Sequence, residues 1–107
     1  MLFIYLVRLV RGSGDHEGRV EIFHDDEWGT VCDDGWGREE ARTVCRQLGF
    51  TGGTPLTDNE FGQGSVRIWL DDVQCSASDR RLADCVASEW GRHNCHHVED
   101  AGVRCDP

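Results

Sequence analysis

Six cysteines are spread through a chain of only 107 residues, and their spacing constrains the fold more than any other feature. They are separated by 12, 29, 9, 9 and 9 residues, so no two of them form a Cys-x-x-Cys pair. An even number of widely spaced cysteines in a short chain indicates a disulfide framework, whereas zinc ribbons and thioredoxin-like sites need two thiolates within one turn. Because disulfides persist in oxidising compartments, the sequence predicts an extracellular protein. The spacing alone leaves the pairing of the cysteines open.

The composition indicates one small domain that needs these cross-links. Apolar residues make up 38% of the chain, and it contains 13 glycines, which lose much conformational freedom on folding. In the chain-entropy model one disulfide offsets about 3 to 4 kcal/mol of this loss, which rivals the net stability of a small domain. We therefore expect reduction to unfold the protein.

The charge is strongly negative, with a formal net value of −9. This makes the chain a poor candidate for general nucleic-acid binding, which requires a cationic surface. All 11 basic residues are arginines. Arginine is favoured where planar contacts with carboxylate or phosphate are needed, but codon or lineage bias explains the absence of lysine equally well.

The N-terminal segment MLFIYLVRLV is apolar, but it lacks the basic start and the cleavage site of a signal peptide. Its unbroken apolar run ends at Arg8, which makes it too short to span a membrane. We expect residues 1–6 to be a fragment boundary and residues 7–107 to form the domain. An export signal or a membrane stalk would then lie outside this chain.

The hydrophobic pattern predicts an α+β domain in which a small curved antiparallel sheet cradles one main helix. Apolar alternation indicates strands, a period of three to four residues indicates the helix, and runs rich in Gly, Asp and Asn indicate loops. The predicted strands are 7–11, 19–24, 28–32, 66–70 and 102–105. The main helix is predicted at 38–48, and a short helix at 79–85 with Ser78 as its N-cap. Residues 51–64 and 89–99 are predicted to be loops.

Eight sequence blocks occur in an order that resembles a known domain family. Between Val7 and Cys105 they are VRLV, EGRVEI, WGTVCDD, VCRQLGF, FGQG, IWLDDVQC, WG and EDAGV. Together with the cysteine spacing, they resemble a scavenger receptor cysteine-rich (SRCR) domain of the six-cysteine group A, most of all the C-terminal domains of class A scavenger receptors. The resemblance implies three disulfides: Cys32–Cys95, Cys45–Cys105 and Cys75–Cys85.

Acidic residues follow several of the cysteines. If Cys32 is bonded to Cys95, the chain brings Asp33 and Asp34 within about a nanometre of Glu99. Converging carboxylates repel one another unless a cation neutralises them, and oxygen ligands of this kind suit Ca²⁺. The alternative is that these are turn residues, whose side chains bond nearby backbone N–H groups.

The resemblance assigns these residues to calcium sites, because members of the family bind Ca²⁺ at matching positions. The first site corresponds to Asp33, Asp34 and Glu99, and the second to Asp71, Asp72 and Asn94. All six residues are present. Affinity is expected to be weak, at about 0.1–1 mM, as in other extracellular modules.

Basic residues offer two further candidates. Three arginines recur every four residues and would form one exposed stripe on the predicted helix: Arg38, Arg42 and Arg46. This stripe is a candidate docking strip for anionic ligands, which Arg80 and Arg81 could extend. The alternative is salt bridging with Glu39 and Glu40, or solvation alone. Three histidines surround Cys95 and suggest either a transition-metal site, a pH-sensitive contact or an ordinary surface loop: His93, His96 and His97.

Nothing in the sequence predicts catalysis, because a Gly-x-Ser-x-Gly elbow or similar nucleophile setting is missing, and the metal hypothesis explains the carboxylates better than a glycosidase pair. We therefore expect a non-catalytic recognition module of a scavenger-type receptor, either secreted or part of an ectodomain. It would bind polyanions such as microbial surface polymers, modified lipoproteins or acidic proteins with Ca²⁺. Two alternatives remain open: an accessory domain of a secreted or membrane-anchored enzyme such as a protease or amine oxidase, and a structural adhesion module.

Overall fold

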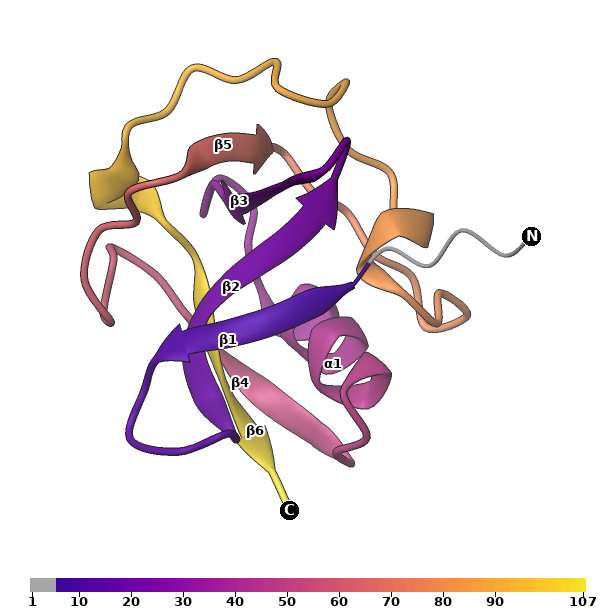
Figure 1. The fold of residues 1–107 in the computed structure, drawn as a ribbon. Helices are drawn as coiled ribbons and strands as arrows, with labels where there is room; N and C mark the ends of the chain where they lie inside the picture. Colours follow the sequence, from indigo (N-terminus) through magenta and orange to yellow (C-terminus); the bar gives the residue numbers. More distant parts are fainter. Residues whose placement is uncertain (1–5) are drawn as a thin grey trace.

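The structure is a computed structural model that describes residues 6–107, so most of the expected boundary segment lies outside the described residues. Six strands form one curled sheet, and one α-helix packs against it within this part of the chain (Figure 1). The strands are β1 (Val7–Arg11), β2 (Glu17–His24), β3 (Glu27–Val31), β4 (Gly52–Leu56), β5 (Arg67–Leu70) and β6 (Gly102–Asp106). The helix is α1 (Arg38–Gln47), and two 3₁₀ turns are η1 (Leu82–Asp84) and η2 (His97–Glu99).

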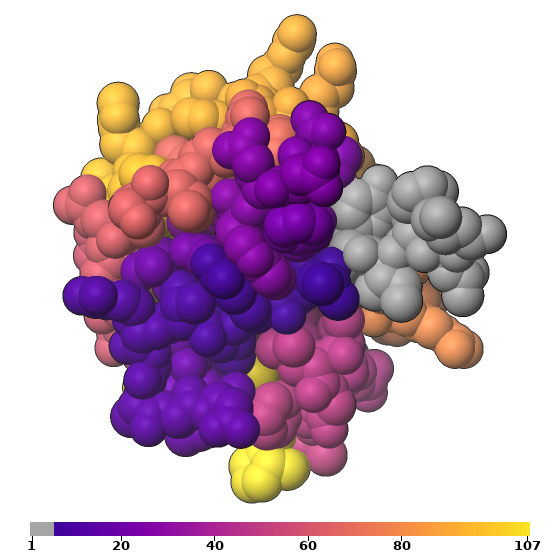
Figure 2. Space-filling view, in the orientation of Figure 1, coloured from indigo at the N-terminus to yellow at the C-terminus, as the bar shows by residue number. Residues whose placement is uncertain are grey.

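Strand β2 organises the sheet, whose order is β4-β6-β2-β3-β5 with β1 paired to β2. Val20 and Ile22 alternate along β2 and are fully buried, as expected of a strand with one face on the core. Glu21 is also buried, because Arg8 and Arg19 donate to its two carboxylate oxygens at 2.6 and 3.3 Å. Figure 2 shows the residues of β1 and β2 covering one face of the molecule beside those of α1.

Helix α1 forms where the apolar period predicts it, one residue shorter at its end. Its buried positions include Ala41, Val44 and Cys45, which join the core. At its start Glu40 accepts the backbone N–H of Gly37 through Oε1 and that of Cys75 through Oε2, both at 2.8 Å. Glu40 therefore holds the start of the helix and the 75–85 segment together. The alternative of a salt bridge between Glu40 and an arginine of the helix is not realised among the described residues.

The three disulfides implied by the resemblance are confirmed. Cys32 is bonded to Cys95, Cys45 to Cys105 and Cys75 to Cys85. The second of these ties α1 to β6 in the middle of the core, where Cys45 is fully buried. The expected fold class, a curved sheet with one main helix, is confirmed as well.

Several details differ from the sequence prediction. Part of the predicted 51–64 loop is strand β4, which pairs with β6 at the edge of the sheet. The sheet is mixed and not wholly antiparallel, because β3 and β5 run parallel. The predicted 79–85 helix shrinks to the single turn η1, preceded by Arg81 and not capped by Ser78. The predicted 89–99 loop contains the turn η2. Among the described residues, no helix is long and apolar enough to cross a lipid bilayer.

Candidate functional site

Three chain segments bring acidic side chains to the same end of the sheet. Because β3 and β5 are parallel neighbours, both strands end at the same edge, and each is followed by an Asp pair: Asp33 and Asp34, then Asp71 and Asp72. The N–H of Cys32 donates to the carbonyl of Leu70 at 2.8 Å and holds the two strand ends together. The Cys32–Cys95 disulfide then adds the segment that carries Glu99.

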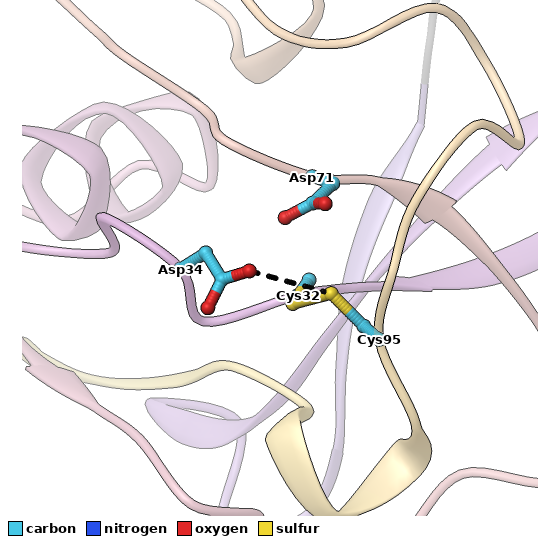
Figure 3. A group of neighbouring side chains, drawn as sticks. All are labelled: Cys32, Asp34, Asp71 and Cys95. Atoms are coloured by element: carbon cyan, nitrogen blue, oxygen red, sulfur yellow. Dashed lines mark hydrogen bonds between the residues drawn. A yellow bond between two sulfur atoms is a disulfide. The ribbon is translucent and has the colours of Figure 1, made fainter.

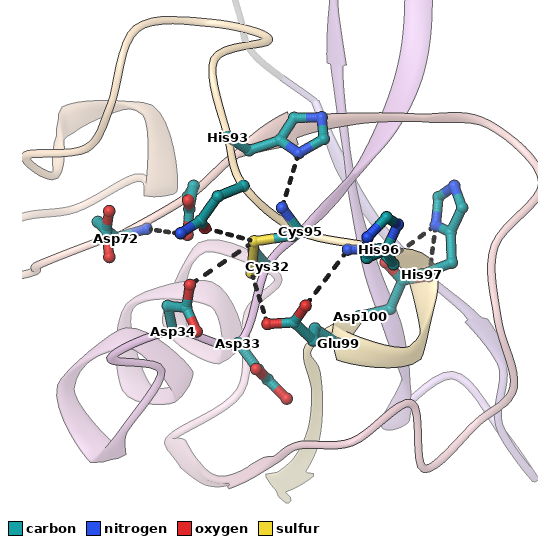
Figure 4. The surroundings of a disulfide bond; sticks show 12 residues. Cys32, Asp33, Asp34, Asp72, His93, Cys95, His96, His97, Glu99 and Asp100 are labelled. Atoms are coloured by element: carbon teal, nitrogen blue, oxygen red, sulfur yellow. Dashed lines mark hydrogen bonds and ion pairs between the residues drawn. A yellow bond between two sulfur atoms is a disulfide. The ribbon is translucent and has the colours of Figure 1, made fainter.

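The first predicted set of ligands converges. Carboxylate oxygens of Asp33, Asp34 and Glu99 all lie within 4.8 Å of one another, around the Cys32–Cys95 disulfide (Figure 4). Asp33 accepts the backbone N–H of Asp58 at 2.8 Å, and Glu99 accepts that of His96 at 3.3 Å. These bonds orient two of the three carboxylates before any ion arrives. We call Asp33, Asp34 and Glu99 the acidic cluster.

The second predicted set converges only in part. Figure 3 shows Asp34 and Asp71 on the same side of the disulfide, and their carboxylates lie within 4.8 Å of each other. Asp71 is buried, whereas Asp72 and Asn94 are exposed. Oδ1 of Asn94 lies 3.6 Å from Sγ of Cys95. Asp34 therefore stands between the two predicted sites, which the sequence did not reveal.

The electrostatics of Asp34 reflect this crowding. Its pKa is raised above the usual value, first by desolvation and then by repulsion from Asp71, Glu99, Asp72 and Asp33. Within residues 6–107, no ion pair joins any of these five carboxylates to a basic side chain. The disulfide sulfurs carry no negative charge and are poor ligands for a hard ion. The site therefore offers carboxylate oxygens whose repulsion a divalent cation would relieve.

The histidines do not form a shared site. Nδ1 of His97 lies 2.9 Å from Oδ2 of the fully buried Asp100, and Nδ1 of His93 accepts the backbone N–H of Cys95 at 3.1 Å. His96 is exposed. In the described part of the chain, no imidazole belongs to a group of three or more ligand atoms close enough to share a metal ion. The structure therefore gives no support to the transition-metal alternative for these three histidines.

The three arginines of the stripe lie on α1 as predicted, but they differ in exposure and in ion pairing. Nη1 of Arg42 lies 3.3 Å from Oε1 of Glu39, as the salt-bridge alternative expected. Arg38 and Arg46 are exposed at opposite ends of the helix. Arg38 follows Asp34 by four residues and is the stripe member closest in sequence to the acidic cluster.

Comparison with known proteins places the chain in a family. The model of the scavenger receptor cysteine-rich domain matches residues 10–106, which is nearly the whole chain. The protein belongs to the SRCR family. SRCR domains are extracellular and generally non-catalytic, and the prediction of an extracellular SRCR module is thereby confirmed.

Solved SRCR domains share the fold closely. The third SRCR domain of murine neurotrypsin is 48% identical with a TM-score of 0.89, covering 96% of this chain and 97% of that one. The SRCR domain of mouse MARCO, solved in a dimeric form, is 46% identical with a TM-score of 0.80, covering 91% and 94%. The CD5_DIII structure is 20% identical with a TM-score of 0.56, covering 96% and 98%, and this likeness shows the fold alone.

Proposed function

We propose that this SRCR domain is an extracellular recognition module that binds polyanionic ligands through Ca²⁺ held at the acidic cluster. The observation that carries the proposal is the convergence of three carboxylates within 4.8 Å of one another, with no basic side chain paired to them in residues 6–107. Ca²⁺ accepts about six to eight oxygen ligands in irregular geometry. Three carboxylates would hold the ion and leave coordination positions for water or for oxygens of a ligand.

The sign of the charge explains why a cation is required. The chain carries a net charge of −9, and its acidic cluster repels an anion in the absence of metal. A bound divalent ion is the largest local charge in such a site and inverts the local field. Phosphate, sulfate or carboxylate groups of a polyanion could then complete the coordination shell.

Two other groups of residues support the cluster in this proposal. Asp71, Asp72 and Asn94 would hold a second ion or strengthen the field around the first, since Asp71 already lies beside Asp34. Of the arginine stripe, Arg38 is nearest in sequence to the cluster and is exposed, and in this proposal it contacts a ligand bound there. Arg46 lies eight residues further along α1, about 12 Å away at 1.5 Å per residue.

Binding to dextran sulfate, measured by biolayer interferometry with about 5 mM calcium or with excess EGTA, tests the proposal. We expect binding with calcium, and at least a tenfold loss with EGTA or in Asp34→Asn and Glu99→Gln, since each variant removes a ligand charge. Asp15→Asn, which removes an exposed charge from the loop between β1 and β2, is the matched control and should bind normally. Binding that persists in EGTA and in both cluster variants would show that calcium does not carry recognition.

A second candidate function is that of an accessory domain within a larger protein. The likeness to a domain that is the third SRCR domain of neurotrypsin supports it. Sequencing the full reading frame decides between the two: an adjoining catalytic domain supports the accessory role, and an adjoining collagen-like or coiled-coil stalk supports the receptor.

A further inference from the structure

A second site for ligands is formed at the other end of α1. The side-chain Oε1 of Gln47 accepts the backbone N–H of Leu82 at 2.8 Å and holds the turn η1 against the end of the helix. This contact brings Arg80 and Arg81 beside Arg46, although they are more than thirty residues apart in sequence. The three arginines line one concave pocket of about 430 Å³.

The rim of this pocket is cationic in a protein that is otherwise strongly acidic. Arg46 and Arg80 are exposed, and within residues 6–107 neither is joined to a carboxylate by an ion pair. Arg81 is oriented by Asp84, which accepts from its Nε and Nη2 at 3.2 and 3.0 Å. The planar guanidinium group suits phosphate and carboxylate oxygens, which it binds in bidentate fashion.

Three carbonyls at the C-terminal end of α1, where the helix dipole is negative, are already hydrogen-bonded. The carbonyls of Val44, Cys45 and Arg46 accept the backbone N–H groups of Leu48, Phe50 and Gly49, at 2.9 to 3.1 Å. These three carbonyls are therefore satisfied within the chain. The two unpaired guanidinium groups remain the dominant charges at the rim.

The rest of the pocket is aliphatic. Leu6, Val7 and Leu48 line it, and Leu6 is 51% exposed. The carbonyl of Leu6 accepts the N–H of Phe23 at 2.9 Å, which fixes its backbone beside the sheet. The pocket therefore has an aliphatic half, which includes the exposed Leu6, and a cationic half formed by the arginines.

We propose that this pocket binds an anionic amphiphile, a single aliphatic chain that carries a phosphate headgroup. The guanidinium groups of Arg46 and Arg80 bind the headgroup, and Leu6 and Leu48 contact the chain. The volume lies within the range of about 300–1,000 Å³ typical of small-molecule sites. Because the pocket and the acidic cluster adjoin opposite ends of α1, this binding does not require calcium and goes beyond the polyanion recognition proposed above.

Isothermal titration of the full chain with dodecyl phosphate, below its micelle concentration, tests the proposal. Inorganic phosphate and dodecyl maltoside, which present the headgroup charge and the tail separately, serve as comparison ligands. The titration is run in EGTA, so that no calcium is held at the acidic cluster, and we expect dodecyl phosphate to bind at least tenfold more tightly than either comparison ligand. Equal affinity for inorganic phosphate, or no binding in EGTA, would overturn the proposal.

Substitutions locate the site. The double variant Arg46→Gln, Arg80→Gln should weaken dodecyl phosphate binding about tenfold or more, because hydrogen bonds to charged groups are strong. Leu6→Asn should weaken it while leaving the affinity for inorganic phosphate unchanged. Arg92→Gln, which removes the same charge from an exposed residue outside this pocket, is the matched control and should bind normally. These side chains are on the surface, and circular dichroism checks that each variant is folded.

Other occupants give distinguishable results. If an acidic peptide is the true ligand, oligoglutamate binds as tightly as dodecyl phosphate and the Leu6→Asn variant binds it normally. If a second copy of the chain covers the pocket, light scattering finds a dimer that the double arginine variant converts to a monomer, and dodecyl phosphate does not bind. Either result would refute the amphiphile site.

Discussion

Removing the Cys45–Cys105 disulfide should destabilise the domain about twice as much as removing Cys75–Cys85. The two bonds close segments with sequence separations of 60 and 10 residues. The chain-entropy model gives about 4 kcal/mol for the longer separation and about 3 kcal/mol for the shorter one. Cys45 and Cys105 are also buried in the core, at 0% and 3% exposure, so replacing both by alanine removes packed sulfur atoms and adds about 2 kcal/mol of cavity cost.

The measurement is guanidinium chloride unfolding of the two double-alanine variants, followed by tryptophan fluorescence. We expect losses of about 6 kcal/mol for Cys45→Ala, Cys105→Ala and about 3 kcal/mol for Cys75→Ala, Cys85→Ala, from the entropy and cavity terms together. The first loss is comparable to the whole stability of a small domain. Mass spectrometry confirms that the remaining two bonds are intact. Equal losses, or a larger loss at Cys75–Cys85, would refute the reasoning.

Two further predictions concern acid stability and packing. Arg104 and Ser13 donate hydrogen bonds to Glu17 and lower its pKa from 4.5 to about 2, so Glu17 stabilises the fold above its usual pKa and this stability is lost as pH falls through about 2. The urea midpoint of the wild-type protein should fall as pH is lowered from 4.5 to about 2, and Glu17→Gln should reduce this fall. An equal fall in the two proteins would contradict the role given to Glu17. A Cβ at Gly53 would lie 2.4 Å from Sγ of Cys45, whereas one at Gly52 meets nothing nearer than 3.7 Å. Gly53→Ala should cost about 1–3 kcal/mol in unfolding free energy and Gly52→Ala much less, and similar losses at the two positions would contradict the packing.

The fold could be predicted from the sequence wherever hydrophobic periodicity was strong. Strand β1 and the start of α1 are found at their predicted residues, because apolar residues there follow one structural period. Strand β4 was missed because Gly52–Leu56 contains two glycines and a proline and has no alternation. Such a strand is stable only as an edge, where Pro55 needs no outward hydrogen bond and β6 supplies the pairing. The pairing of β4 with β6, about fifty residues later in the chain, leaves no pattern in the sequence of β4 itself.

The acidic cluster was predictable because the family resemblance supplied the Cys32–Cys95 bond, which fixes Asp34 near Glu99. The place of Asp34 between both sets of ligands was not, since it depends on the parallel pairing of β3 with β5. The pocket at the end of α1 was not predictable either. It depends on one side-chain contact, from Gln47 to the backbone of Leu82, that no sequence period reports.

The most direct test of the calcium hypothesis is the free energy of unfolding measured in EGTA and in about 10 mM calcium. For an affinity of about 0.1–1 mM, calcium at about ten to one hundred times the dissociation constant should stabilise the native state by about 1.4 to 2.7 kcal/mol. Asp34→Asn should lose most of this gain while the control Asp15→Asn keeps it. If calcium leaves the unfolding free energy of the wild-type domain unchanged, the carboxylates that the Cys32–Cys95 disulfide draws together do not form a calcium site.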